Sequence, residues 1–398
     1  MTLDHKAAYL NAHMAGPQVY MLLTPEVAAL MCKVDPKYRN FLRTDGKITV
    51  RLKKALYGCI QSAVLWYNEL ASTLEAMGFV RNPYDICSFS RIRDGSTDRI
   101  LVYVDELFIT SKHEHVLTSI ATTLKKKYGA VTSNMGLEHN FLGIHWDFSV
   151  PGQATLSMDG YIRDIIRKYN VTTKANTPSN ENLFKTDSSS PKLPKRKQEE
   201  FHSLVMTLYY LAKRIRPDIL TSVSYAASRV LNPTQEDETK LEKILSCLLC
   251  TIDQKLVIWI GDRIELRVFV DASFGLFEDS KSVTGVVIKF GDATIYVKSG
   301  KQKIATRSST ESELVGISDA LSQVLWTREY LLSAGINVGA AILYQDNQST
   351  MFLANKGRST SERKSPHQNQ KLFRSSLHRI SPEVFLIHSG FVELLINF

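Results

Sequence analysis

The chain has 398 residues, of which 44% are hydrophobic and 22% are charged. This is the composition of a globular protein, and it excludes a chain that is disordered as a whole. The net charge of +9 favours polyanionic partners such as nucleic acid, because lysine and arginine displace counterions from a phosphate backbone. Neither a signal sequence nor a run of roughly 20 apolar residues is present. The sequence therefore predicts an intracellular protein, cytoplasmic or nuclear, with no membrane partner.

The first part of the chain mixes helical and strand patterns. We predict a helical stretch over 53–79, a strand at 88–92, a turn, a strand over 99–111, a helix over about 115–128 and a strand over 141–148. The strands on either side of the turn form a β-hairpin. Together these elements predict a β-α-β-rich first unit that ends near residue 150.

The second part begins with a short helix at 161–169 and continues into polar chain. Residues 177–200 are rich in serine, proline and lysine and are the best candidate for a linker. Three helical patterns follow, at 201–215, 217–231 and 234–252. The period then changes to short strands at 256–260, 265–274, 283–290 and 294–300, a helix at 311–335 and a strand at 341–346. This order predicts a separate α/β domain from about residue 263.

Five cysteines form an odd and sparse set, which suits a reducing compartment. Cys247 and Cys250 make a C-x-x-C within an apolar helical pattern, with no second ligand pair nearby. We expect buried core thiols there rather than a zinc or redox site.

Acidic residues in the first part suggest a metal-dependent site. Asp4 lies in LDHKAAYLN, and Asp105 and Glu106 lie in LVYVDELFIT at the tip of a predicted hairpin. Nucleotidyl transfer uses two Mg²⁺ ions, and hard Mg²⁺ prefers carboxylate oxygens. From these residues alone, ordinary solvated surface acids are the favoured interpretation.

A second acidic set lies in the predicted α/β domain. Asp271 follows a strand pattern in VFVDASF, Glu311 and Glu313 begin a helix in SSTESELVGIS, and Asp346 ends a strand in LYQDNQS. Carboxylates so placed can converge on two Mg²⁺ ions and activate water against a phosphodiester. Taken singly, each is more consistent with an ordinary surface acid.

An ordered series of motifs resembles copia-type retrotransposon polyproteins, in which a reverse transcriptase is followed by a ribonuclease H. The segments LDHKAAYLN, RLKKALYGCIQSAVLWYNEL, YVDELFIT and FLGI are similar to reverse transcriptase motifs of that family. KSVTGVVIKF, KQKIATRSSTESELVGISDA and LYQDNQS resemble its ribonuclease H motifs, the last of which has the family pattern L-Y-C-D-N-Q-S. The resemblance runs from Asp4 to about Phe373.

The resemblance implies an α+β fold, with a reverse transcriptase palm and helical thumb or connection, then a ribonuclease H-like α/β domain with a mixed sheet. The implied domains are a palm at 1–150 with truncated fingers, thumb and connection helices at 151–262 with the polar linker near 177–200, and the ribonuclease H-like domain at 263–398. Only three residues precede Asp4, so we expect the fingers segment to be missing.

The resemblance also assigns roles to single residues of the palm. Asp4 and Asp105 would bind metal, and Glu106 stands where the family has a second aspartate. Its extra methylene moves the carboxylate by about 1.5 Å, and catalysis tolerates such displacement poorly. Tyr9 falls where an aromatic ring excludes a 2′ hydroxyl, although a core aromatic is the alternative interpretation. Gly58 and Gln61 lie in the template-contacting segment.

In the second domain Asp271, Glu313 and Asp346 would bind metal, and we prefer Glu313 to Glu311 because its run matches the onset of the family helix. Asn369 replaces a further catalytic aspartate, and a neutral amide cannot supply the anionic oxygen.

The resemblance implies two Mg²⁺ per site, with Mn²⁺ as a substitute, and an RNA/DNA hybrid or template-primer and deoxynucleoside triphosphates as partners in a cytoplasmic virus-like particle or the nucleus. The substitutions predict a decayed copy. An inactive nucleic-acid-binding relic and a residual ribonuclease H are the alternatives.

Overall fold

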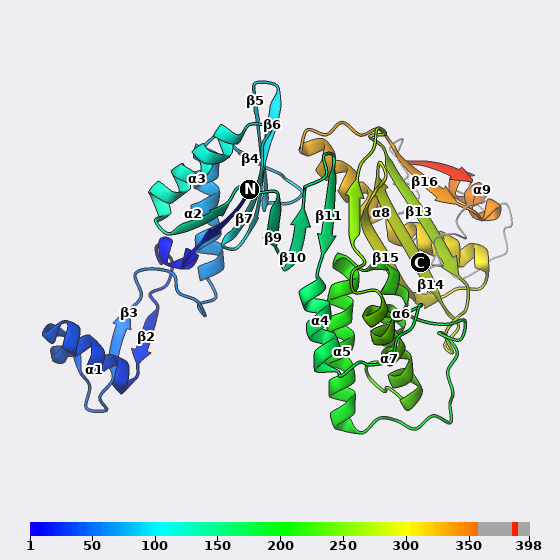
Figure 1. Cartoon of the computed structure of the whole chain (residues 1–398), viewed down its shortest axis with the longest axis horizontal. Helices are drawn as coiled ribbons and strands as arrows, with labels where there is room; N and C mark the ends of the chain where they lie inside the picture. The colour runs from blue at the N-terminus through cyan, green and yellow to red at the C-terminus, as the bar shows by residue number, and fades with distance from the viewer. Residues whose placement is uncertain (357–383, 389–398) are drawn as a thin grey trace. The chain divides into compact units, whose positions relative to one another are not determined.

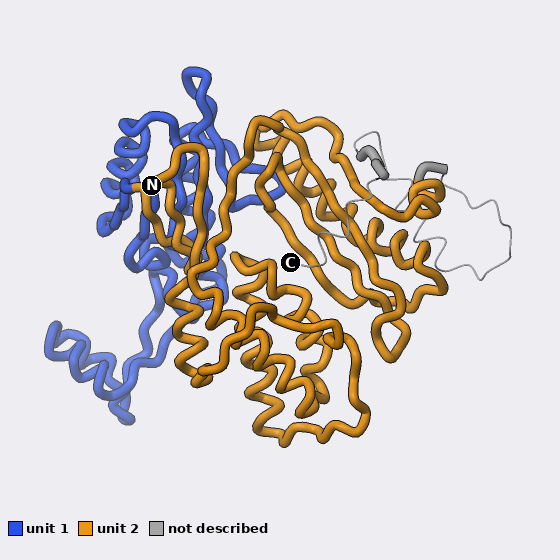
Figure 2. Tube along the Cα trace, turned by 45° about the vertical axis from the view of Figure 1, so that its right-hand side comes forward, with its two compact units in different colours: residues 1–136 blue, residues 137–398 orange. Residues whose placement is uncertain are grey.

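The computed structural model describes residues 1–356 and 384–388, and within them the chain forms two compact units. Unit 1 comprises Met1–Gly136, and unit 2 begins at Leu137 (Figures 1 and 2). Helices and sheets occur in both units, which confirms the predicted α+β class. Asn369 lies outside the described residues.

Unit 1 is built on an antiparallel six-stranded sheet in the order β4-β5-β6-β7-β1-β8. Its strands are β1 (Thr2–His5), β4 (Val80–Arg81), β5 (Ser88–Arg93), β6 (Ser96–Tyr103), β7 (Glu106–Thr110) and β8 (Val131–Asn134). The first strand of the chain therefore lies between β7 and β8, although those strands are about a hundred residues away in sequence. This insertion brings Asp4 beside the β6–β7 hairpin.

Two helices cover this sheet with apolar side chains. They are α2 (Ser62–Ala76) and α3 (Glu114–Tyr128), and their buried residues pack with the strands in one core. The expected helical stretch over 53–79 is thus shorter than predicted, because Gly58 takes a positive φ of 95° that interrupts any helix before Ser62. The helix predicted over about 115–128 is confirmed.

A smaller layer in unit 1 consists of a two-stranded antiparallel sheet and the helices that connect its strands, and it has its own core. Its elements are strands β2 (Tyr20–Leu23) and β3 (Ile48–Arg51), α1 (Pro25–Val34) and 3₁₀ helix η2 (Pro36–Phe41). The 3₁₀ helix η1 (Ala8–Asn11), which precedes them, packs into the main core of the unit through Ala8. Leu23, Ala28, Cys32 and Ile48 form the buried part of this layer.

Unit 2 begins with a four-stranded sheet in the order β12-β11-β10-β9, packed with helices. Its elements are β9 (Glu138–Phe141), β10 (Ile144–Asp147), β11 (Gln153–Ser157), α4 (Asp159–Lys168), α5 (Lys195–Arg214), η3 (Pro217–Ile219), α6 (Leu220–Arg229), α7 (Gln235–Cys250) and β12 (Leu256–Trp259). The three predicted helical segments are confirmed as α5, α6 and α7. Residues 195–200, expected in the polar linker, form the first turns of α5.

The second sheet of unit 2 is mixed and has the order β15-β14-β13-β16-β17. Its elements are β13 (Leu266–Ser273), β14 (Lys281–Phe290), β15 (Ala293–Ala305), α8 (Ser309–Ser333), β16 (Ala341–Gln345), α9 (Gln348–Lys356) and β17 (Val384–His388). The β13, β14 and β15 strands form an antiparallel meander, whereas β16 pairs in parallel with β13. The predicted mixed sheet is confirmed.

Helix α8 packs against β13 and β14 at unusually short range. An added Cβ at Gly316 would lie 3.3 Å from Cγ1 of Val270 and 3.6 Å from Cβ of Ala272. Glycine leaves room for this approach, because even an added Cβ would be tighter against Val270 than most Cβ contacts. This approach places the first turn of α8 beside the end of β13.

Candidate active site

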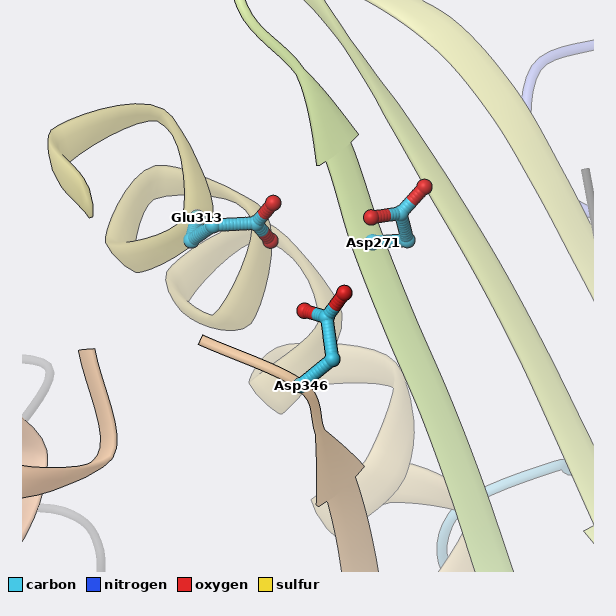
Figure 3. A group of neighbouring side chains, drawn as sticks. All are labelled: Asp271, Glu313 and Asp346. Atoms are coloured by element: carbon cyan, nitrogen blue, oxygen red, sulfur yellow. The ribbon is translucent and has the colours of Figure 1, made fainter. Parts of the chain in front are cut away.

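Three carboxylates of unit 2 converge on one point. Asp271 lies on β13, Glu313 in the first turns of α8, and Asp346 immediately after β16. One ligand oxygen from each lies within 4.8 Å of the other two, and the side chains point toward a shared space (Figure 3). Strand pairing brings Asp271 and Asp346 together, because β13 and β16 are parallel neighbours and both residues lie toward the carboxyl ends of these strands.

Burial and mutual repulsion disfavour negative charge in this cluster. The Glu313 side chain is buried, and the residue is only 4% exposed. Its pKa rises from 4.5 to about 8, first because of burial and then because of the charge of Asp271. Hydrogen bonds from Gln345 and from the backbone of Ala272 oppose this rise without cancelling it. Burial, followed by the charge of Asp346, also raises the pKa of Asp271.

The donor set of this cluster fits a hard divalent cation. All three side chains supply carboxylate oxygens, which Mg²⁺ and Mn²⁺ prefer. A cation between them would offset the burial and the mutual repulsion that raise the pKa values of Asp271 and Glu313. Within residues 1–356, this is the one group of three acidic, histidine or cysteine side chains whose ligand atoms lie so close together.

Gln345 also belongs to the site, and the sequence reasoning missed it. Its side chain is fully buried, and its Nε2 donates to Oε2 of Glu313 at 3.1 Å. Its Oε1 accepts the backbone N–H groups of Asp346 at 2.8 Å and Asn347 at 3.0 Å. The signal was in the motif, since glutamine stands in LYQDNQS where the family pattern has cysteine.

Glu311, the other acidic residue considered for the helix position, has a different task. Its carboxylate accepts the backbone N–H of Arg307 at 2.7 Å, and its own N–H donates to Oγ of Ser308, the N-cap of α8. Glu311 therefore caps the helix that carries Glu313. Its carboxylate is absent from the described metal-ligating cluster.

The acidic residues predicted for a palm lie on neighbouring segments of the unit 1 sheet, Asp4 on β1 and Asp105 and Glu106 at the turn between β6 and β7. Asp4 on β1 is the direct cross-strand partner of Glu106 on β7, and the N–H of His5 donates to the carbonyl of Asp105 at 3.0 Å. Across the described residues, however, the carboxylates of Asp4, Asp105 and Glu106 do not make a group with ligand atoms within 4.8 Å. The chain brings these segments together, and the metal role of the three carboxylates stays a prediction.

The hairpin tip itself is strained and is held by a buried tryptophan. Val104 has a positive φ of 54°, which is rare for a β-branched residue. The indole Nε1 of Trp66 on α2 donates to the carbonyl of Val104 at 2.6 Å. Asp105 follows directly, so this contact fixes where the acidic tip lies.

Two tyrosine rings lie against each other beside the same tip. The ring centroids of Tyr9 and Tyr57 lie 4.4 Å apart with a tilt of 31°. Burial raises the pKa of the Tyr57 hydroxyl, and the charge of Asp105 raises it further. Tyr57 was not singled out from the sequence, although it lies in the same motif as Gly58. Gln61, predicted to contact template, is the N-cap residue of α2, and its Nε2 lies 3.5 Å from Sδ of Met14.

The C-x-x-C of α7 divides into two different environments. Cys247 is buried, as expected of a core thiol, and burial raises the pKa of its thiol. Cys250 is exposed, which corrects the expectation that both thiols are buried. The residue ends the helix, where the apolar face no longer meets the core.

In the described part of the chain, no helix is long and apolar enough to cross a membrane.

Residues 2–180 match the family model of the reverse transcriptase (RNA-dependent DNA polymerase). The chain is 31% identical over 307 residues to the retrovirus-related Pol polyprotein from transposon RE2 of Arabidopsis thaliana, a match that covers 76% of this chain and 21% of that protein. It is a reverse-transcriptase-containing segment of a copia-type Pol polyprotein. A match at 25% identity to the Pol polyprotein from transposon TNT 1-94 of Nicotiana tabacum covers 76% of the segment and 23% of the relative.

This Pol segment spans about a fifth of the length of the relatives that it matches. Its match to the Arabidopsis protein is longer than residues 2–180, so the relationship continues beyond the reverse transcriptase model. Among solved structures, RNase H1 from the archaeon Halobacterium salinarum NRC-1 aligns with 32% of the segment and 88% of its own chain, at 12% identity and a TM-score of 0.24.

Proposed function

We propose that unit 2 hydrolyses the RNA strand of an RNA/DNA hybrid with the help of divalent cations. The observation that carries the proposal is the convergence of Asp271, Glu313 and Asp346 from three separate elements onto one point. The convergence is costly, because the three carboxylates repel one another and Glu313 is buried, and a bound cation would offset that cost. The motif series adds the substrate class, since these residues match the ribonuclease H part of the copia-type family.

Each residue of the cluster would contribute an oxygen ligand, and the bound cations would supply Lewis-acid activation of water and of the phosphate. Without a cation Glu313 keeps a proton up to about pH 8. Cation binding therefore has to displace that proton, and we expect the affinity to increase as the pH rises. The backbone of β13 and the cap of α8 hold the carboxylates in place meanwhile.

A cleavage assay tests this proposal. The purified chain, given Mg²⁺ or Mn²⁺ and a hybrid labelled on its RNA strand, should release RNA fragments, and Asp346→Asn should abolish the release. Asp319→Asn is the matched control, because Asp319 is an exposed carboxylate on α8 paired with Lys298 at 3.4 Å, outside the cluster. Equal cleavage by the chain and by Asp346→Asn would defeat the proposal.

A second candidate function, RNA-directed DNA synthesis, rests on the reverse transcriptase match over residues 2–180. Asp4 and Asp105 would hold the cations there, with Glu106 beside them, and Tyr9 would face the sugar of the incoming nucleotide. Primer extension on an RNA template with deoxynucleoside triphosphates tests it. Extension that disappears in Asp105→Asn supports it, and extension that persists in that variant refutes it.

Binding without catalysis is the remaining alternative for this segment. It predicts that the chain retains a hybrid in a mobility-shift assay while both activity assays stay silent. We further propose the division 1–150, 151–262 and 263–398 as palm, thumb or connection, and ribonuclease H-like domain. Its first boundary lies inside unit 2, which begins at Leu137, in the turn between the paired strands β10 and β11. Limited proteolysis followed by mass spectrometry tests this division, because cleavage should cluster near its two boundaries.

A further inference from the structure

Gln345 bonds to three structural elements that meet at the acidic cluster. Its Nε2 donates to Glu313 on α8, and the same nitrogen lies 3.5 Å from the carbonyl of Val270 on β13. Its Oε1 accepts two successive backbone N–H groups in the turn between β16 and α9. One fully buried amide therefore ties together the helix, the strand and the turn that carry the three carboxylates.

We propose that Gln345 is a positioning residue that sets the cation affinity of the Asp271, Glu313 and Asp346 cluster. The inference rests on the proposed metal-dependent function of that cluster and deepens it. Gln345 would bind no cation itself. It would act through the orientation of the Glu313 carboxylate and through the backbone that presents Asp346.

The geometry gives a physical reason for this role. Glu313 faces two further carboxylates, and the N–H donated by Gln345 to Oε2 holds its carboxyl group in that orientation. The turn after β16 needs an acceptor for the N–H groups of Asp346 and Asn347, and Gln345 supplies it. Partners of this kind, which hold a ligand rather than the metal, typically change metal affinity by about 10- to 100-fold when they are removed.

A second buried glutamine in the same sheet provides a matched control. Gln302 on β15 is 2% exposed, and its Nε2 donates to Oγ1 of Thr284 and to the carbonyl of Ser312 on α8, both at 2.9 Å. It is thus as buried as Gln345 and also anchors α8, but the bonds of its amide go to a hydroxyl and a carbonyl, not to a carboxylate. Loss of either amide should cost stability, whereas only loss of Gln345 should cost cation affinity.

The test measures Mn²⁺ binding to the full chain by electron paramagnetic resonance of the free ion. All proteins carry Asp105→Asn, so that the palm does not contribute. Methionine replaces each glutamine at nearly constant volume, giving Gln345→Met and Gln302→Met. We expect Gln345→Met to weaken Mn²⁺ binding by about 10- to 100-fold and Gln302→Met to leave it within about twofold of the parent.

Two outcomes separate the failures. If Asp346→Asn in the same background binds Mn²⁺ as tightly as the parent, the proposed function of the cluster fails. If Asp346→Asn loses binding while Gln345→Met and Gln302→Met bind alike, the positioning role alone is overturned.

A measurement on the chain without glutamine substitutions covers the case in which Gln345→Met does not fold. Addition of Mg²⁺ should shift the side-chain amide resonance of Gln345 and leave that of Gln302 in place. Equal shifts, or no shift at Gln345 at saturating Mg²⁺, would overturn the positioning role.

Discussion

Replacement of Glu313 by glutamine should change how the stability of unit 2 depends on pH. The pKa of Glu313 is about 8 in the folded chain, against an ordinary value of 4.5. Between these two values the unfolded chain has released the proton that the folded chain retains. The contribution of this group to stability is therefore fully present below pH 4.5 and is lost progressively as the pH rises to about 8.

The size of this loss follows from the pH range between the two pKa values of Glu313, 4.5 in the unfolded chain and about 8 in the folded chain. Each pH unit inside it costs about 1.4 kcal/mol of unfolding free energy, so the cation-free chain should lose about 2.5 kcal/mol between pH 5 and pH 7 through Glu313. Glutamine at 313 has nearly the same shape and does not ionise. The loss should therefore vanish in Glu313→Gln, apart from the parallel but separate contribution of Asp271, whose pKa is also raised.

Urea unfolding in the presence of a chelator provides the assay. Hydrogen exchange of peptides from α8 reports the helix that carries the residue. Asp319→Asn serves as the control, because it removes a carboxylate from the exposed face of the same helix. Relative to the unaltered chain, Glu313→Gln should gain about 2.5 kcal/mol on going from pH 5 to pH 7. If the unfolding free energies of Glu313→Gln and of the unaltered chain change by the same amount between pH 5 and pH 7, the reasoning is refuted.

Three further substitutions test other features. Val104→Gly should stabilise unit 1 by about 1 kcal/mol in thermal unfolding, because glycine takes a positive φ without strain; a lower midpoint would contradict this. Gly316→Val should cost at least 1–3 kcal/mol and weaken hybrid cleavage, since its side chain would collide with Val270; an unchanged urea midpoint would count against the close approach. Arg91→Met should cost about 3–5 kcal/mol, because it leaves Asp98, which is 1% exposed, without the partner that now lies 2.9 Å away; a loss below 1 kcal/mol would show that Asp98 does not depend on it.

Element types were predictable from the sequence wherever a period ran for several turns, as in α3, α5 and α7. The interruptions were harder. The segment 99–111 was expected as one strand, but it turns at Val104 and Asp105 and becomes β6 and β7, as the family resemblance implied. The segment 141–148 likewise turns at Leu142 and Gly143. Valine and leucine seldom adopt a positive φ, so propensity gave no warning of either turn.

In the candidate site, too, residues marked by a local pattern were predictable, and residues defined by distant contacts were not. The acidic residues were found because their motifs and strand ends mark them, and Glu313 was preferred to Glu311 by the position of the helix onset. Gln345 and Trp66 escaped notice because their roles depend on distant contacts, one with α8 and one with a hairpin tip. The local sequence around a buried amide or indole does not predict which distant group it will bond to.

The parallel pairing of β13 with β16 also bears on the order in which the domain is made. The β13, β14 and β15 meander needs only neighbouring chain, whereas β16 must wait until α8 has been synthesised and has crossed the sheet. Contacts between residues so distant in sequence form slowly, because the entropy cost of closing the loop comes before the favourable energy of strand pairing. A nascent chain on the ribosome therefore cannot assemble the acidic cluster until Asp346 has been translated, after the β13, β14 and β15 meander and α8.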